Sequence, residues 1–135
     1  MADKATVRQL RPVRVLVASS DPAFVGRTTG ALAAVGFHVM STTAATRVPE
    51  LAAVQRVNVV VLDASGGVAA AAALASTLDA LPQRVRVLLA AGRGRSAARL
   101  GYENVNASAS AEELAAAVHR AYRGGPRRNG RPSRV

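Results

Sequence analysis

Short apolar runs alternate with helix-like segments along most of this chain, and this alternation strongly limits the folds it can adopt. The longer runs cover 13–18, 57–62 and 84–90, and shorter ones occur at 37–40 and around Val105. Apolar runs of four to eight residues are typical of strands that are buried on both faces of a parallel sheet. The sequence therefore predicts an α/β protein in which each strand is followed by a helix.

Capping residues mark where several of the helices begin and end. Asp21 precedes Pro22, which predicts an N-cap followed by proline at the first helical position. An apolar stripe follows at helical spacing and stops before Gly36, a residue typical of helix ends. That stripe consists of Phe24, Thr28, Leu32 and Val35. Farther along, Ser110 and Glu113 have the spacing of a capping box and predict the start of the last helix.

Further helices are predicted near 49–54, along the Ala-rich stretch that contains Leu74, Leu78 and Leu81, and over the basic stretch 93–100. With the two capped helices, they complete five strand–helix units. Successive units of this kind form a parallel sheet with helices on both faces, because such crossovers are right-handed. We therefore predict a flavodoxin-like (βα)5 fold, a three-layer sandwich with strand order 2-1-3-4-5.

Both ends of the chain lack the apolar periodicity of the middle. Residues 1–11 are polar, and residues 123–135 are rich in Gly, Pro and Arg. Neither stretch has a face that it could bury. We expect a flexible N-terminal segment at 1–11, one folded domain at 12–122 and a disordered basic tail at 123–135.

The net charge of the chain is +10, and half of it lies in the tail. A basic chain can bind nucleic acid or an anionic surface. Abundant Ala, a single Lys and no Ile also point to the codon bias of a GC-rich genome, so the Arg count alone is weak support for binding. The tail has no aromatic residues for base stacking, so any contact with nucleic acid would be weak, nonspecific and electrostatic.

The chain has no Cys, which excludes disulfides and Cys-ligated metal sites. The most apolar stretch, 68–81, is shorter than a bilayer span and contains Ser76, Thr77 and Asp79. No apolar run follows the first charges, as a secretory leader would require. We therefore expect a soluble cytoplasmic protein with no membrane span.

Ligands of such sheets bind at the carboxyl ends of the strands, where the strand order reverses. Two loops meet there, one with Ser19, Ser20 and Asp21 after the first strand and one with Asp63 after the third. The layout and the segments VLVASSDPAFV, NVVVLDASGG and SAEELAAAV resemble the receiver domain of bacterial response regulators, the CheY-like family. The resemblance covers about residues 12–122.

The resemblance implies a phosphoacceptor at Asp63, the last residue of the third strand. The two acidic residues that hold Mg²⁺ in the family correspond to Ser19 and Ser20, and Asp21 lies one place beyond. The family's Thr or Ser at the end of the fourth strand corresponds to Ala90. The Lys that ends the fifth strand falls in the region 106–108, which has none.

These replacements remove most of what phosphoryl transfer needs, since neutral hydroxyls neutralise little negative charge. We therefore predict an atypical pseudo-receiver with no enzymatic activity, no cofactor and no metal site, although weak Mg²⁺ binding by Asp21 and Asp63 stays open. Asp63 would then hydrogen-bond to nearby backbone amides or Ser hydroxyls.

Three functions follow from these observations. The first is a regulatory module that binds a protein partner without phosphorylation. Its contacts would involve Arg93, Arg95 and Arg99, the tail, or a homodimer through the fourth helix, fifth strand and last helix. The second is a working phosphoacceptor of a two-component system that uses Asp63. The third is a weak binder of nucleic acid or an anionic surface through the tail.

Overall fold

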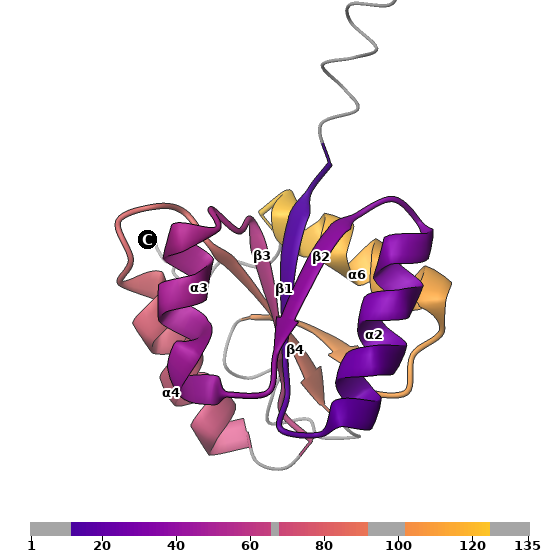
Figure 1. Ribbon diagram of the computed structural model, residues 1–135, viewed down its shortest axis with the longest axis horizontal. Helices are drawn as coiled ribbons and strands as arrows, with labels where there is room; N and C mark the ends of the chain where they lie inside the picture. The colour runs from indigo at the N-terminus through magenta and orange to yellow at the C-terminus, as the bar shows by residue number, and fades with distance from the viewer. Residues whose placement is uncertain (1–11, 66–67, 92–101, 125–135) are drawn as a thin grey trace, which may run out of the picture.

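The structure, a computed structural model, describes residues 12–65, 68–91 and 102–124. Five strands form one parallel sheet with the order β2-β1-β3-β4-β5 (Figure 1). They are β1 (Arg14–Ala18), β2 (His38–Thr42), β3 (Val59–Asp63), β4 (Arg86–Ala91) and β5 (Glu103–Asn106). The predicted α/β class and strand order are therefore confirmed.

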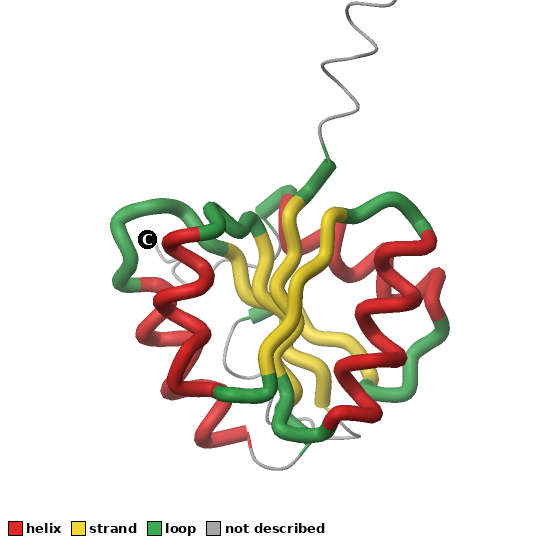
Figure 2. The backbone as a smooth tube through the Cα atoms, in the orientation of Figure 1, coloured by secondary structure: helices red, strands yellow, loops and turns green. Residues whose placement is uncertain are grey.

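Helices cover both faces of this sheet and give it three layers. The helices are α2 (Pro22–Ala34), the short 3-10 helix η1 (Ala45–Arg47), α3 (Val48–Val54), α4 (Val68–Asp79) and α6 (Ala111–Tyr122). Helices α3 and α4 lie on one face, and α2 and α6 lie on the other (Figures 1 and 2). Each helix runs back from the carboxyl ends of the strands to their amino ends, as right-handed crossovers require.

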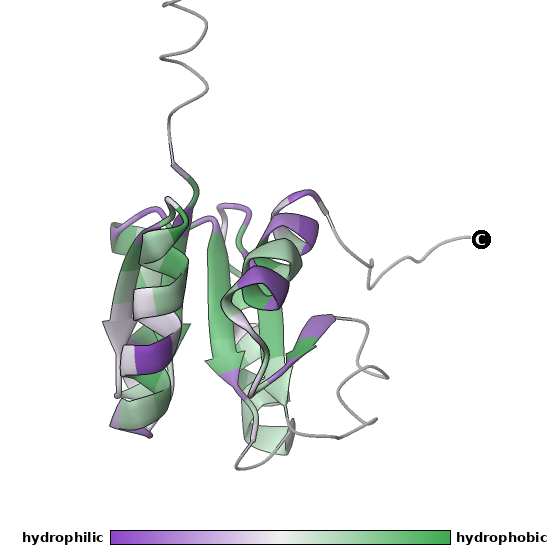
Figure 3. Ribbon diagram, turned by 90° about the vertical axis from the view of Figure 1, so that its right-hand side faces the viewer, coloured by the Kyte–Doolittle hydropathy of each residue, from purple (hydrophilic) through white to green (hydrophobic). Residues whose placement is uncertain are grey.

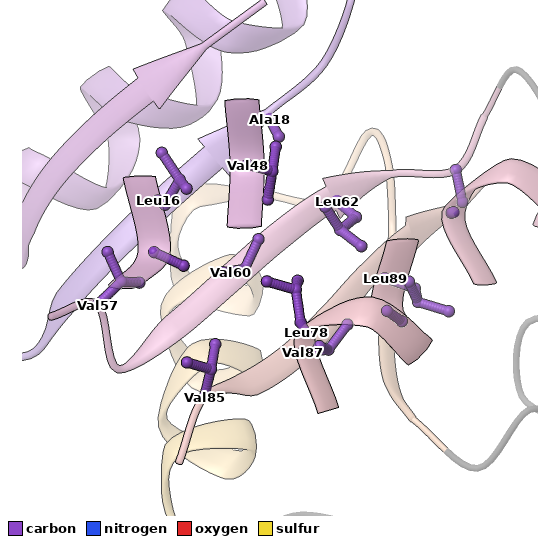
Figure 4. Close-up of a cluster of buried hydrophobic side chains, with 14 of the residues drawn as sticks. Leu16, Ala18, Val48, Val57, Val60, Leu62, Leu78, Val85, Val87 and Leu89 are labelled. Atoms are coloured by element: carbon purple, nitrogen blue, oxygen red, sulfur yellow. The ribbon is translucent and has the colours of Figure 1, made fainter. Parts of the chain in front are cut away.

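Alternate residues of the strands point to opposite faces and build two separate cores. On one face Leu16, Val60 and Leu89 pack against α3 and α4 (Figure 4). On the other, Val15, Val61 and Leu88 pack against α2 and α6. These strand residues are fully buried. The unbroken apolar runs of the sequence are thus explained by a sheet that is covered on both sides.

Helix α2 follows its predicted caps, with one difference at its end. Phe24, Thr28 and Leu32 are buried, but Val35 is 50% exposed. Val35 is the C-cap rather than a helical residue, and the chain turns at Gly36, with φ +104°, toward the buried Phe37 and strand β2. The assignment of Val35 to the apolar stripe was therefore wrong, because spacing alone does not show where the last turn stops.

Strand boundaries differ from the predicted ones by one or two residues. Val57 and Asn58 precede β3 rather than belonging to it, and β4 includes Ala91. The capping box of Ser110 and Glu113 is present at the start of α6. The predicted helix at 93–100, the N-terminal segment, the Gly66–Gly67 loop and most of the tail lie outside the described residues.

Candidate functional site at the carboxyl ends of the strands

The last residue of β3, Asp63, lies beside Ser19, which directly follows β1. These two strands are hydrogen-bonded neighbours in the sheet, so their carboxyl ends bring the two loops together. The hydroxyl of Ser19 donates to Asp63 Oδ2 over 2.6 Å. Ser19 is only 8% exposed. The two loops predicted from sequence to form one site therefore do meet.

The second carboxylate oxygen of Asp63 accepts two hydrogen bonds from Ser65. The backbone N–H of Ser65 lies 2.9 Å from Oδ1, and its hydroxyl lies 2.6 Å from the same atom. This is a turn in which an Asp side chain bonds to the backbone two residues on. Both oxygens of Asp63 are thus engaged by neutral donors from its own chain.

These contacts decide the charge state of Asp63. Burial raises the pKa of its carboxyl, but the hydrogen bonds from Ser19 and Ser65 and the positive charge of Arg27 lower it by more. The net result is a pKa below the ordinary value of an Asp side chain. Asp63 is therefore ionised at neutral pH.

Among the described residues, Ser20 and Asp21 form no hydrogen bond with the Asp63 carboxylate, whose partners are Ser19 and Ser65. Ser20 is exposed. Asp21 caps α2, since its carboxylate accepts from the backbone N–H of Ala23 over 3.0 Å. Its own backbone N–H donates to Ser19 Oγ over 2.9 Å. Ser19 therefore connects the start of α2 to Asp63, while the Asp21 carboxylate is used by the helix.

The residues present are a poor fit to Mg²⁺. That ion prefers an octahedral shell of oxygens, usually with one or two carboxylates held for it. Within residues 12–65, 68–91 and 102–124, no group of three or more His, Cys, Asp or Glu residues could hold a metal ion. Asp63 is the one carboxylate here that does not cap a helix, and its partners are Ser hydroxyls.

Ala90 pairs with Asp63 in the register of β3 and β4 and is 1% exposed. Its side chain belongs to the core cluster shared by α2 and α6. Ala107 packs against the same cluster, whereas Asn106 accepts both the backbone N–H and the hydroxyl of Ser108. Of the three residues at 106–108, Ala107 thus shares a face with Ala90. Neither residue has a polar side-chain atom.

Arg27 is the residue of this site that sequence reasoning missed. It lies on α2, where its guanidinium stands over the ring of Phe24 at 5.8 Å from the centroid. Its charge lowers the pKa of Asp63. The available signal was its position on the helix capped by Asp21, three residues beyond the buried Phe24.

The site opens to solvent through a hollow of about 480 Å³ between the loops after β1, β2 and β3 and the helix α4. Ser19, Ser20, Asp21, Asp63 and Ser65 line it together with apolar residues of α4. A small molecule could therefore reach the Asp63 carboxylate. Arg93, Arg95 and Arg99, predicted as partner-binding residues, lie outside the described residues.

No protein-family model matches this sequence, and no curated protein matches it. Several solved structures, in contrast, have a similar fold. The signal receiver domain of the response regulator NarL from Mycobacterium tuberculosis superposes with a TM-score of 0.62 at 23% identity, covering 84% of this chain and 98% of that chain. A response regulator receiver domain protein from Clostridium thermocellum gives 0.68 at 16% identity, covering 82% and 94%. The chain has the receiver-domain fold.

A response regulator from Desulfuromonas acetoxidans has the same receiver fold, with a TM-score of 0.65 at 17% identity over 79% of this chain and 94% of that one. The resemblance stated from the strand and loop motifs is thus matched by the three-dimensional arrangement.

None of the helices in residues 12–65, 68–91 and 102–124 has the length and apolar character that a membrane span requires.

Proposed function

We propose that this protein is a regulatory receiver-like module that acts by binding another protein, without phosphorylation of Asp63. The observation that carries this proposal is the state of the Asp63 carboxylate. It accepts three hydrogen bonds from Ser19 and Ser65, and Asp21, the other acid lining the same hollow, caps helix α2. The proposed role is regulatory rather than enzymatic.

Phosphorylation of Asp63 would have to overcome each of these features. An attacking carboxylate oxygen must leave its Ser partners and approach phosphorus while the charge on the transferred group is neutralised. Arg27 is the one cation acting on Asp63 in the described site. Without a paired carboxylate the Mg²⁺ that normally supplies this neutralisation is held weakly.

A phosphoryl group on Asp63 would also have little to reorganise. Ala90 has no hydroxyl to follow the phosphate, and Ala107 has no ammonium to pair with it. Both side chains are packed into the α2–α6 core cluster or against it. The structural consequences of phosphorylation would therefore stay local to the Asp63 loop.

One observation favours the alternative function, a working phosphoacceptor that uses Asp63. The carboxyl is ionised at neutral pH, as a nucleophile must be, and it lines an open hollow. The two functions differ in whether a phosphate mimic binds.

The deciding experiment titrates isotope-labelled protein with beryllium fluoride and Mg²⁺ while NMR follows the backbone amides. Our proposal expects no shift at Ser19, Ser65 or Ala90 beyond that caused by Mg²⁺ with fluoride alone. Saturable shifts at these amides would establish the phosphoacceptor function instead.

A variant with the missing groups restored provides the matched control. Ser19→Asp, Ser20→Asp, Ala90→Thr and Ala107→Lys together rebuild the pattern that the family uses. This variant is expected to show saturable shifts around Asp63, which demonstrates that the titration detects binding. If the natural protein shows saturable shifts as large as those of the variant, the four replaced positions do not decide phosphorylation, and the proposal is wrong.

A further inference from the structure

Charged side chains are partly segregated between the two edges of the sheet. At the carboxyl ends of the strands, the acids sit where helices begin or β3 ends (Asp21, Glu50, Asp63, Glu112, Glu113). The opposite edge, where the strands begin, carries arginines. We call the following residues the basic edge: Arg14, Arg56, Arg84, Arg86 and Arg123. Figure 3 shows hydrophilic residues along the loops at this edge.

Part of this segregation follows from the fold itself. Helices α3, α4 and α6 all end at the basic edge, and helix C-termini favour cations. That effect reaches only the last turn of a helix. Arg84 belongs to a loop, and Arg14 and Arg86 begin strands. The helix ends therefore account for only some of the positive charge.

Two adjoining hollows run along the basic edge. One, of about 510 Å³, is lined by Arg56, Asn58 and the loop 82–84. The other, of about 570 Å³, shares the loop 82–84 and continues past Arg86 to Gly124. The accessible lining of the second hollow is partly apolar, since it includes the half-buried Leu81 and the exposed Pro82. The edge thus forms a groove with basic rims rather than a convex charged surface.

The acids in this groove are already engaged. Asp79 accepts the hydroxyl of Tyr102 over 2.7 Å, and Glu103 pairs with Arg120 over 2.5 Å. In contrast, Arg56, Arg84 and Arg123 form no salt bridge with any other described residue. The lining of the two hollows thus holds three arginines (Arg56, Arg84 and Arg86) against two acids, one of which already pairs with Arg120.

The chain on either side of the domain has the same sign. Residue 12 lies beside the start of β1 and Gly124 lines the second hollow, so both flanking segments depart from the basic edge. They carry Lys4, Arg8 and Arg11 on one side and Arg127, Arg128, Arg131 and Arg134 on the other, against Asp3 alone. Neither of these two segments therefore supplies the acidic residues that would complement the groove.

We propose that the groove of the basic edge binds an acidic polypeptide segment of a partner protein. Its carboxylates would pair with Arg56 and Arg84, and its apolar side chains would contact Leu81 and Pro82. This inference rests on the proposed interaction function, for which it names the surface and the class of partner.

A peptide fits this groove better than nucleic acid does. Duplex DNA carries a negative charge about every 1.7 Å, so Asp79 and Glu103 would repel a backbone that followed the hollow. Carboxylates in a peptide are sparser and can avoid these two acids. The apolar part of the lining also has no role in contacting phosphates.

The test measures binding of a fluorescent peptide of alternating Glu and Leu residues to the full chain, without Mg²⁺ or a phosphate mimic. The double variant Arg56→Gln/Arg84→Gln removes two positive charges from the groove. Arg47→Gln removes one from the carboxyl edge and serves as the control, with Arg56→Gln alone as its matched single change in the groove. Since exposed ion pairs contribute up to about 1 kcal/mol each, the double variant is expected to weaken binding about tenfold and the control less than about twofold.

Chemical-shift mapping then locates the contact. The proposal expects peptide-induced shifts at Asn58, Gln83 and Gly124 and none at Ser19 or Ser65. Equal loss in Arg56→Gln and Arg47→Gln, or shifts confined to the carboxyl edge, would overturn it. Displacement of the peptide by single-stranded DNA of equal charge at lower concentration would assign the groove to nucleic acid instead.

The outcome is separate from that of the phosphate-mimic titration. Binding of the peptide only after beryllium fluoride and Mg²⁺ are added would support the groove and refute phosphorylation-independent function. No peptide binding in either condition, with a silent beryllium fluoride titration, would refute the groove alone.

Discussion

Ser19 offers the sharpest test of whether Asp63 is held as a structural carboxylate. Its buried hydroxyl donates to Asp63 Oδ2 over 2.6 Å and accepts from the backbone N–H of Asp21 over 2.9 Å. Hydrogen bonds to charged groups contribute about 1.5–3 kcal/mol. The backbone N–H of Asp21, an exposed residue, can donate to water instead once the hydroxyl is removed. Ser19→Ala is therefore expected to lower the free energy of unfolding by about 2 kcal/mol.

Urea denaturation of Ser19→Ala, Asp63→Asn and the double variant closes a thermodynamic cycle. If the Ser19 hydroxyl stabilises the Asp63 charge, the two changes are coupled by about 1–2 kcal/mol at neutral pH. Ser65→Ala provides a matched comparison, since its hydroxyl donates to the same carboxylate but is exposed. Its coupling to Asp63 is expected to be smaller, about 0.5–1 kcal/mol.

The same cycle has a predicted dependence on pH. Asp63 has a lower pKa in the folded state than in the unfolded chain, so the unfolded state binds more protons in acid. Its contribution to stability is complete above the unfolded pKa, near about 4, and is lost as the pH falls through the lower folded pKa. The coupling between Ser19 and Asp63 should shrink over that range. Additive effects at neutral pH, or a coupling that persists in acid, would refute this account of Asp63.

Two further predictions concern the scaffold, and both are checked by chemical denaturation. In α2, Gly30→Ala is expected to stabilise the protein by about 0.5–1 kcal/mol, because a Cβ there meets nothing within 4 Å and the helix gains propensity. Gly36→Ala has equally open space but φ +104°, so it should destabilise by about 1 kcal/mol; equal effects of the two changes would contradict this reasoning. Leu89 is fully buried in β4, and Leu89→Ala should cost about 2–5 kcal/mol, whereas a loss below about 1 kcal/mol would mean that this core is loosely packed.

Sequence reasoning reached the fold because its signals are local and repeat along the chain. The apolar runs and the caps at Asp21 and Ser110 each depend on a few neighbouring residues. Five alternating units then leave few topologies, since crossovers in parallel sheets share one hand. The errors in the predicted boundaries at Val35 and around β3 also follow from this local character. Where a helix or strand ends depends on tertiary packing, which a local sequence pattern does not contain.

The location of the candidate site was predicted, but the contacts among its side chains were not. The sequence alone predicted that Asp63 ends a strand and, through the resemblance, that Ser19 and Ser20 correspond to the acids of a receiver. It also shows that residues 106–108 contain no Lys. It left open what the Asp63 carboxylate does. The lowering of the pKa of Asp63 by the charge of Arg27 was not predicted.

Only the tertiary structure decided which groups face one another. It pairs Ser19 with Asp63 across 44 positions of the chain, turns Ala107 rather than Asn106 toward the face of Ala90, and gathers Arg14, Arg56 and Arg84 at one edge. The physical reason is that strand pairing and register set these positions. In a sheet, a shift of one residue moves a side chain to the opposite face, and no local sequence pattern determines that shift.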